Sequence, residues 1–318
     1  MKNTIVDLNV HLAQKQQLPV AALIEKNPII ASIPMKPASH GIYNVYSKTL
    51  DIQTAQEVDY DAELPTVGIS FDLGQTRLGK IGGKLPIPMD AAMNMGGWQK
   101  YVDDRMPSII GKSGNENEAK IYYSGFLKYA LANKRVISAG GKTSDKQFSM
   151  VAVHYDRAST VGLYNPNTYQ NGSGKLFTQL MLNGGNVHGL EVEGKKCLGK
   201  MLAVFMEFGL QLADPEAVNA IVNIEPAPDT NNADKIAGLP TAMQINDMLA
   251  AVRADTAATV IYAHPVLVNY LAIKYNLDKR SVTDATTGVS YNLTEWNGVP
   301  LIGSYNISWG KESVIDLA

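Results

Sequence analysis

One segment of the sequence comes close to a phosphate-binding loop. Residues 74–81 read Gly-Gln-Thr-Arg-Leu-Gly-Lys-Ile, which matches the two glycines and the lysine of the loop whose backbone N–H groups cradle phosphates. However, Ile81 stands where that loop has a hydroxyl residue to hold magnesium. The residues that follow alternate between polar and apolar, which indicates a strand where the loop requires a helix. We therefore predict strand structure here and no nucleotide site.

Four carboxylates lie on one face of an extended segment just before that loop. They could offer oxygen ligands to a cation of the calcium type. The spacing of a calcium loop is not met, because Leu64 replaces the sharp-turn glycine and Ser70 the bidentate glutamate. We predict a solvated face or a contact between subunits, and more specifically an acidic strip that faces three basic residues, within one subunit or across two. The acids are Glu57, Asp59, Asp61 and Glu63, and the bases are Arg77, Lys80 and Lys84.

The remaining reactive side chains do not form a recognisable catalytic or metal-binding set. The five histidines are scattered, and none has a second ligand at the short spacing of a zinc site. Cys197 lies beside three lysines, but no signature of a cysteine nucleophile surrounds it. The neighbouring Asp103 and Asp104 would diverge on a helix. We predict no catalytic, cofactor-binding or metal-binding residue, and keep a hydrolase that uses Cys197 or a carboxylate pair as a less favoured alternative.

The composition describes a chain that folds and makes large protein contacts. Its 318 residues suffice for one large domain or two interlocked ones. Charged residues make up 18%, below the roughly 25% that is usual, so a smaller share of the surface is charged and more of it can bind other protein surfaces. The net charge of −2 and the absence of a basic run predict weak, nonspecific contact with DNA at most. We expect no signal peptide, no membrane segment and, with a single cysteine, no intrachain disulfide.

The first half of the sequence predicts an arm, a projecting hairpin and a long helix. Four prolines break up the first forty residues, which read as an arm. Alternation around residues 67–87 predicts a long hairpin that turns at residues 72–74 and leaves the body, because three glycines deny it packing. The capping box at residues 113–116, Ser-Gly-Asn-Glu, predicts a helix that begins there and continues to about Asn133. The glycines are Gly79, Gly82 and Gly83.

The second half predicts a mixture of strands and helices. Residues 201–212 fit a strand or a helix equally well on periodicity. Asp214 is the expected N-cap of a helix over residues 215–224. Trp296-Asn297-Gly298 is a hairpin turn signal between two closing strands. The other expected elements are strands over 150–154, 159–163 and 258–263 and helices over 241–253 and 264–275.

Four segments in this order are similar to those of one protein family. They are Glu-Lys-Asn-Pro-Ile-Ile at 25–30, Val-Ile-Ser-Ala-Gly-Gly at 136–141, the run from Leu212 to Ile224 that contains Asp-Pro, and Trp-Asn-Gly-Val-Pro-Leu at 296–301. Together with the order of arm, hairpin, long helix, α+β block and closing strands, they resemble the major capsid proteins of tailed bacteriophages, which have the Hong Kong 97-like fold. The order and spacing of the segments carry the resemblance.

That resemblance implies an α+β fold with named parts. These are an N-terminal arm (1–40), an E-loop hairpin with flanking strands (41–90), a P-domain with a long spine helix (91–144), an A-domain (145–287) and C-terminal strands that return to the P-domain (288–318). The E-loop lysines Lys80 and Lys84 could support a lysine–asparagine crosslink, as in some relatives. The asparagine and the catalytic glutamate cannot be assigned by motif, so we do not expect one.

The same resemblance implies a function and partners. The chain would assemble with itself, as pentamers and hexamers, into an icosahedral head that holds double-stranded DNA by enclosure. Scaffold, portal and decoration or minor capsid proteins would be further partners. The protein would be found in the virion, assembled in the bacterial cytoplasm, without cofactor or membrane. A similar shell, the encapsulin-like nanocompartment, is the alternative.

Overall fold

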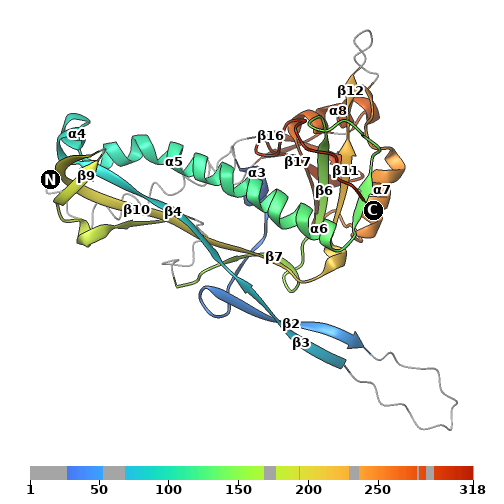
Figure 1. The fold of residues 1–318 in the computed structure, drawn as a ribbon, viewed down its shortest axis with the longest axis horizontal. Coiled ribbons are helices and arrows are strands. Elements are labelled where there is room, and N and C mark those ends of the chain that lie inside the picture. The colour runs from blue at the N-terminus through green and yellow to red at the C-terminus, as the bar shows by residue number, and fades with distance from the viewer. Residues whose placement is uncertain are drawn as a thin grey trace.

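A continuous helical rod crosses the molecule and organises it (Figure 1). The rod consists of α5 (Trp98–Lys120), the π-helical η1 (Ile121–Leu127) and α6 (Lys128–Ala132). The computed structural model describes residues 27–52, 69–167, 177–192, 194–228, 236–277, 279–283 and 290–317. Within these, the seven-stranded sheet lies at one end of the rod, α4 (Met89–Asn94) at the other, and a strand ribbon projects to one side.

The predicted start of this helix is wrong. The helix begins at Trp98, and Ser113 and Glu116 lie inside it rather than at a cap. Pro107 and Gly111 lower the intrinsic helix propensity of residues 98–112, so the sequence suggested a later start. Packing outweighs propensity here, because this first half buries one face of the helix in the main core. The buried residues are Tyr101, Val102 and Met106.

A six-stranded sheet lies along the rod. Its centre is the antiparallel pair β4 (Gly79–Pro88) and β10 (Lys195–Leu212). Leu85 is opposite Leu202 and Ile81 opposite Met206, and these four side chains pack in the core beneath the rod. Residues 201–212, ambiguous from the sequence, are therefore strand. The remaining strands are β1 (Met35–Pro37), β7 (Thr160–Tyr164), β8 (Phe177–Met181) and β9 (His188–Val192).

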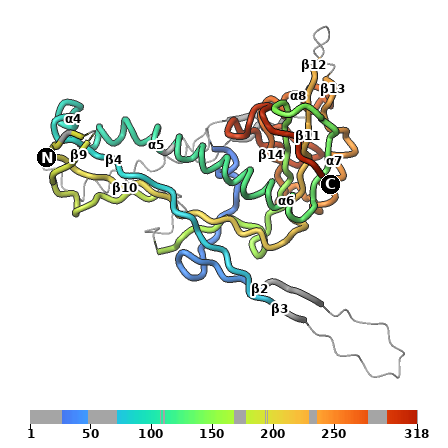
Figure 2. The backbone as a smooth tube through the Cα atoms, in the orientation of Figure 1, coloured from blue at the N-terminus to red at the C-terminus, as the bar shows by residue number. Residues whose placement is uncertain are grey.

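The predicted hairpin with its turn at residues 72–74 is wrong. β2 (Tyr43–Ile52) pairs antiparallel with β3 (Ile69–Arg77), and β3 passes straight through residues 72–74. The trace in Figure 2 shows β3 running on into β4 where the ribbon leaves the body. The three glycines belong to β4, and at Gly82 an added Cβ atom would overlap the backbone of Phe205 on β10. The glycine thus allows close strand packing.

A seven-stranded sheet forms the core at the other end. Met150 and Ala152 point to one face, which α7 (Ala242–Ala251) and α8 (Pro265–Tyr275) cover. Val151 and Val153 point to the other face, which packs on the rod. In sheet order the strands are β15 (Lys279–Thr283), β16 (Ser290–Trp296), β17 (Val299–Gly303), β14 (Thr259–Ala263), β6 (Phe148–His154), β11 (Val218–Ile224) and β5 (Val136–Ser138).

Most predicted elements of the second half are confirmed, and one is wrong. The expected helix over 215–224 is only the short turn η3 (Pro215–Ala217), which Asp214 caps as predicted, followed by strand β11. Every residue of β11 is buried, because its β-branched run lies in the middle of a sheet. The confirmed elements are β6, β7, β14, α7, α8 and the β16–β17 hairpin.

Each of the two large sheets combines strands from segments that the family resemblance assigns to different domains. Strands β7 to β10 share a sheet with β4, and β16 and β17 share one with β14 and β6. How the chain divides into domains therefore stays a prediction. The small elements are α3 (Pro28–Ser32), η2 (Leu182–Gly185), β12 (Ala227–Pro228) and β13 (Ile236–Ala237).

Candidate functional site

The β2–β3 ribbon presents one face with exposed apolar side chains. In the register of the two strands, Ser47 is opposite Leu73 and Val45 is opposite Gln75, so Val45 and Leu73 share this face. The exposed fractions are 76% for Leu73 and 37% for Val45. On the opposite face the ring of Tyr46 lies across Gly74, where any Cβ atom would collide with it. The ribbon therefore has a packed side and an uncovered side.

The base of the ribbon is fixed to the body by buried amides. Asn44, only 2% exposed, donates a 2.6 Å hydrogen bond from Nδ2 to Oε1 of Gln211 on β10. Gln211 in turn donates from Nε2 to the carbonyl of Ala158 over 2.6 Å. Leu78, directly after β3, is buried, and its N–H bonds to the carbonyl of Ile42. The direction in which the ribbon leaves the body is thus set by its base.

The three predicted basic residues are exposed, Arg77 at the end of β3 and Lys80 and Lys84 on β4. As expected, Lys80 and Lys84 share the exposed face of β4, while the intervening isoleucine packs inward. Lys80 pairs with Glu207 at 3.3 Å and lies 4.0 Å from the ring centre of Phe205. Lys84 is exposed, and Arg77 lies on the ribbon with its guanidinium 5.8 Å from the ring centre of Tyr43.

The acidic half of that hypothesis is not described. Glu57, Asp59, Asp61 and Glu63 lie outside the described residues, so whether they face the three bases stays a prediction. Glu207, the acid that Lys80 meets, was not anticipated. It is 8% exposed and also accepts a 2.6 Å bond from Nδ2 of Asn165.

A buried carboxyl group joins three distant segments at the middle of the rod. Glu118 is fully buried; its Oε1 accepts from the N–H of Ile29 at 2.8 Å, and its Oε2 accepts from Nδ2 of Asn306 at 2.8 Å. Asn27, also fully buried, lies 3.4 Å from the same Asn306 amide. Burial raises the pKa of Glu118 from 4.5 to about 7, against the hydrogen bonds that favour its charged form.

A second, half-buried carboxyl group ties the C-terminal segment to the rod. Glu312 accepts from the hydroxyl of Tyr123 at 2.8 Å and from that of Ser149 at 3.0 Å. The Ser149 hydroxyl also bonds to that of Tyr122, and the Tyr123 oxygen accepts from the N–H of Ser308. Burial raises the pKa of Glu312 as well. These contacts connect the rod, β6 and the last residues of the described chain.

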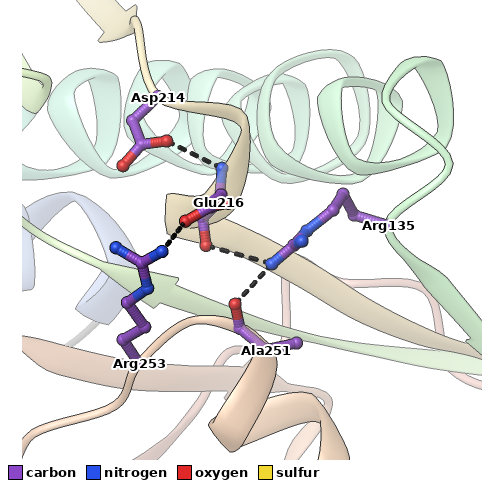
Figure 3. Close-up of polar contacts among 5 residues, drawn as sticks. All are labelled: Arg135, Asp214, Glu216, Ala251 and Arg253. Carbon is purple, nitrogen blue, oxygen red and sulfur yellow. Dashed lines mark hydrogen bonds and ion pairs between the residues drawn. The ribbon is translucent and has the colours of Figure 1, made fainter. Parts of the chain in front are cut away.

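Arginine side chains connect the end of the rod to the η3 turn and to the end of helix α7 (Figure 3). Arg135, which follows the rod, donates to the carbonyl of Ala251 at the end of α7 and to that of Glu216. Arg253 forms a 2.6 Å ion pair with the carboxylate of Glu216, and the N–H of Glu216 bonds to Asp214. Both arginines therefore have a structural role, since Arg135 binds the carbonyl group at the end of α7 and both arginines bind the η3 turn.

The other candidates from the sequence do not come together. Residues 74–81 run from β3 into β4 as strands, as predicted. Cys197 is a half-buried free thiol on β10, and Asp103 and Asp104 are neighbours on α5. Within the described ranges, no three histidine, cysteine or acidic side chains gather as a metal site, and no helix there is long and apolar enough to cross a membrane.

Comparison with known proteins identifies the fold. No family model and no curated protein matches the sequence. A solved structure of bacteriophage Epsilon15 is similar over 88% of this chain and 87% of that chain, with 14% identity and a TM-score of 0.51. The chain has the Hong Kong 97-like fold. The predicted α+β class is thereby confirmed.

Two further solved structures are less similar. The procapsid of bacteriophage JBD30 matches at 9% identity over 94% of this chain and 99% of that chain, with a TM-score of 0.40. The SrpI encapsulin of Synechococcus elongatus matches at 10% identity over 62% of this chain and 87% of that chain, with a TM-score of 0.45. At these TM-scores neither likeness supports an argument, so the Hong Kong 97-like fold rests on the Epsilon15 structure.

Sequence reasoning missed the carboxyl groups of Glu118 and Glu312. Glu118 lies in the polar run Asn-Glu-Asn-Glu, which reads as a solvated helix face, and Glu312 follows a lysine near the end of the chain.

Proposed function

We propose that this chain is a major capsid protein, a structural subunit that assembles as pentamers and hexamers into an icosahedral phage head around double-stranded DNA. The Hong Kong 97-like fold supports this proposal, and the observation that carries it is the β2–β3 ribbon. A two-stranded ribbon is marginally stable by itself in water. This one is held at its base by Asn44 and leaves Leu73 76% exposed, so it gains stability where another subunit covers it.

Other exposed groups fit the same role. Both strands of the ribbon have unpaired outer edges within their described lengths, and such edges readily contact another chain. Tyr305 and Trp309, exposed by 82% and 64%, lie on the C-terminal segment, and large aromatic residues are typical of interface centres. We propose that both surfaces are covered by sister subunits in the shell.

We further propose that the charged residues of the E-loop act between subunits. Lys84 is exposed and Arg77 lies on the ribbon, so both are accessible to the acidic strip of a neighbour, whereas Lys80 already neutralises Glu207. The acids are Glu57, Asp59, Asp61 and Glu63. Opposite charges at the edge of an interface contribute more to register and association rate than to affinity.

The role we infer is structural rather than catalytic, and the partners follow from it. DNA would be held by enclosure, because the net charge of −2 gives no general attraction for phosphates. Scaffold, portal and decoration proteins are expected partners in assembly within the host cytoplasm, and the virion is the expected final location.

Electron microscopy of the purified full-length protein tests the proposal. We expect closed shells that contain nuclease-protected DNA when they are isolated from infected cells. Shells filled with a cargo protein would favour the encapsulin-like alternative. A small oligomer with hydrolytic turnover that Cys197→Ala abolishes would favour an enzyme and contradict the proposal.

A further inference from the structure

The contacts of Glu118 tie together the beginning, middle and end of the described chain. The carboxyl group lies on the rod, its first partner is the backbone of Ile29 in α3, and its second is the side chain of Asn306 in the C-terminal segment. Gly114, one turn earlier on the rod, leaves space for the amide of Asn27, because a Cβ atom there would overlap it. Three segments far apart in sequence therefore depend on one side chain.

The groups that face Glu118 are all uncharged near neutral pH. From the N-terminal segment these are the amide of Asn27 and the N–H of Ile29, and from the C-terminal segment Ser304 and Asn306. From β14, the Tyr262 hydroxyl is nearby: burial raises the pKa of Tyr262, and the charge of Glu118 adds a smaller rise. Tyr262 also bonds to Ser32 and Tyr155. A charged carboxylate at this place is thus hydrogen-bonded but has no cation among these neighbours.

The site can accept both protonation states of the carboxyl group. An asparagine amide offers donors on one side and an acceptor on the other. In the structure Nδ2 of Asn306 donates to Oε2 of Glu118, the arrangement that suits a charged carboxylate, and a half-turn of the Asn306 amide would present an oxygen to the proton of neutral Glu118. We propose that Glu118 is a proton-controlled latch: when neutral it holds the N-terminal and C-terminal segments on the rod, and when charged it favours a state in which they have moved away and water reaches the carboxyl group.

The direction of this effect follows from linkage between protonation and conformation. In the closed state the pKa of Glu118 is about 7, whereas a hydrated carboxyl group has a value of 4.5. Below pH 4.5 both states are protonated and the latch is closed to its full extent. As the pH rises from 4.5 to 7 the open state loses its proton first, so the ratio of open to closed molecules grows, by up to about 300-fold, and levels off above pH 7.

Hydrogen exchange of the full-length protein tests the latch. Exchange of the backbone amides of residues 29–33 is measured by mass spectrometry from pH 4.5 to 8.5 and divided by the intrinsic exchange rate at each pH. The amides of α7 serve as an internal reference. We expect the opening of residues 29–33 to increase from pH 4.5 to 7, while α7 shows no such increase.

Three variants make the test specific. Glu118→Gln should keep residues 29–33 closed at every pH, whereas Glu116→Gln, an exposed position on the same helix, should retain the wild-type profile. Asn306→Ala removes a donor to the carboxylate, which raises the pKa of Glu118, so opening should extend to higher pH. This variant and the wild type decide the matter if Glu118→Gln does not fold.

The latch is overturned if residues 29–33 of the wild type open equally at all pH values, or open less as the pH rises. An unchanged pH profile in Glu118→Gln, or a shift of the Asn306→Ala profile to lower pH, would also overturn it. The inference concerns the chain itself and does not depend on its role in a shell, so its failure would leave the proposed function untouched.

Discussion

Replacing Leu73 by aspartate should abolish assembly while leaving the subunit folded. Complete burial of a leucine side chain contributes about 1.5–3 kcal/mol, so covering the 76% that is exposed contributes about 1–2 kcal/mol for each subunit. Aspartate loses this and brings a carboxylate whose burial costs several kcal/mol more. Each 1.4 kcal/mol changes an association constant tenfold, so we expect the association constant of this contact to fall by about a thousand-fold or more.

The assay measures assembly and folding separately. Shell yield is followed by sedimentation and electron microscopy over a range of protein concentrations, and folding by circular dichroism and urea unfolding. The stability of the unassembled subunit should change by less than about 0.5 kcal/mol, because an exposed position makes few contacts within the chain. Met243→Asp on α7 is the matched control, since Met243 is exposed by 73% but lies far from the ribbon in the fold.

Two outcomes would refute this reasoning. Normal shells of Leu73→Asp at wild-type concentration would mean that no neighbour covers the ribbon. An equal loss of shells in Met243→Asp would mean that any added charge impairs assembly and that the ribbon has no special part in it.

Three further predictions concern the E-loop and its base. Lys84→Glu should reduce shell yield without changing the melting temperature of the subunit. Lys80→Glu should reduce shell yield and also lower the melting temperature, because it puts a second carboxylate beside buried Glu207. Equal melting temperatures of the two variants would contradict this. Asn44→Ala leaves Gln211 without its donor and should lower the free energy of unfolding by about 1–3 kcal/mol in urea, and a change near zero would count against the anchor. Boiled, denatured particles should give a monomer-sized band, and a ladder of multimers would reveal crosslinks.

Local signals in the sequence were sufficient for the elements that depend on neighbouring residues. Thr241 caps α7 through a reciprocal bond with Gln244, and both residues are visible in the sequence. Asn297 and Gly298, with φ values of 49° and 80°, form the tight turn that this residue pair predicts between β16 and β17. The alternation that puts Lys80 and Lys84 on the exposed face of β4 is equally local.

Elements that depend on distant partners could not be predicted. The hairpin was expected at residues 72–74 because both flanking stretches alternate, but β4 pairs with β10, more than a hundred residues away in sequence. The seven residues of β11 looked like the continuation of a capped helix, and only their position between β6 and β5 makes them a strand. Pairing between remote segments leaves no trace in a single sequence.

The candidate site could not be predicted for the same reason, because it too depends on contacts between distant segments. The side of the rod that Glu118 occupies is buried by α3 and by the C-terminal segment, and neither contact has a local signal. An acidic residue in a polar helical run is normally solvated, so its burial is visible only in the fold. The exposed side chain of Leu73 was likewise hidden, because the sequence does not say which face of a ribbon is covered.

The most direct test of the central claim is a cryo-electron microscopy map of particles assembled from the full-length chain. We predict that each β2–β3 ribbon lies on a neighbouring subunit and that this neighbour covers Leu73. A map in which the ribbon folds back on its own subunit, with no neighbour in contact with it, would contradict the proposal.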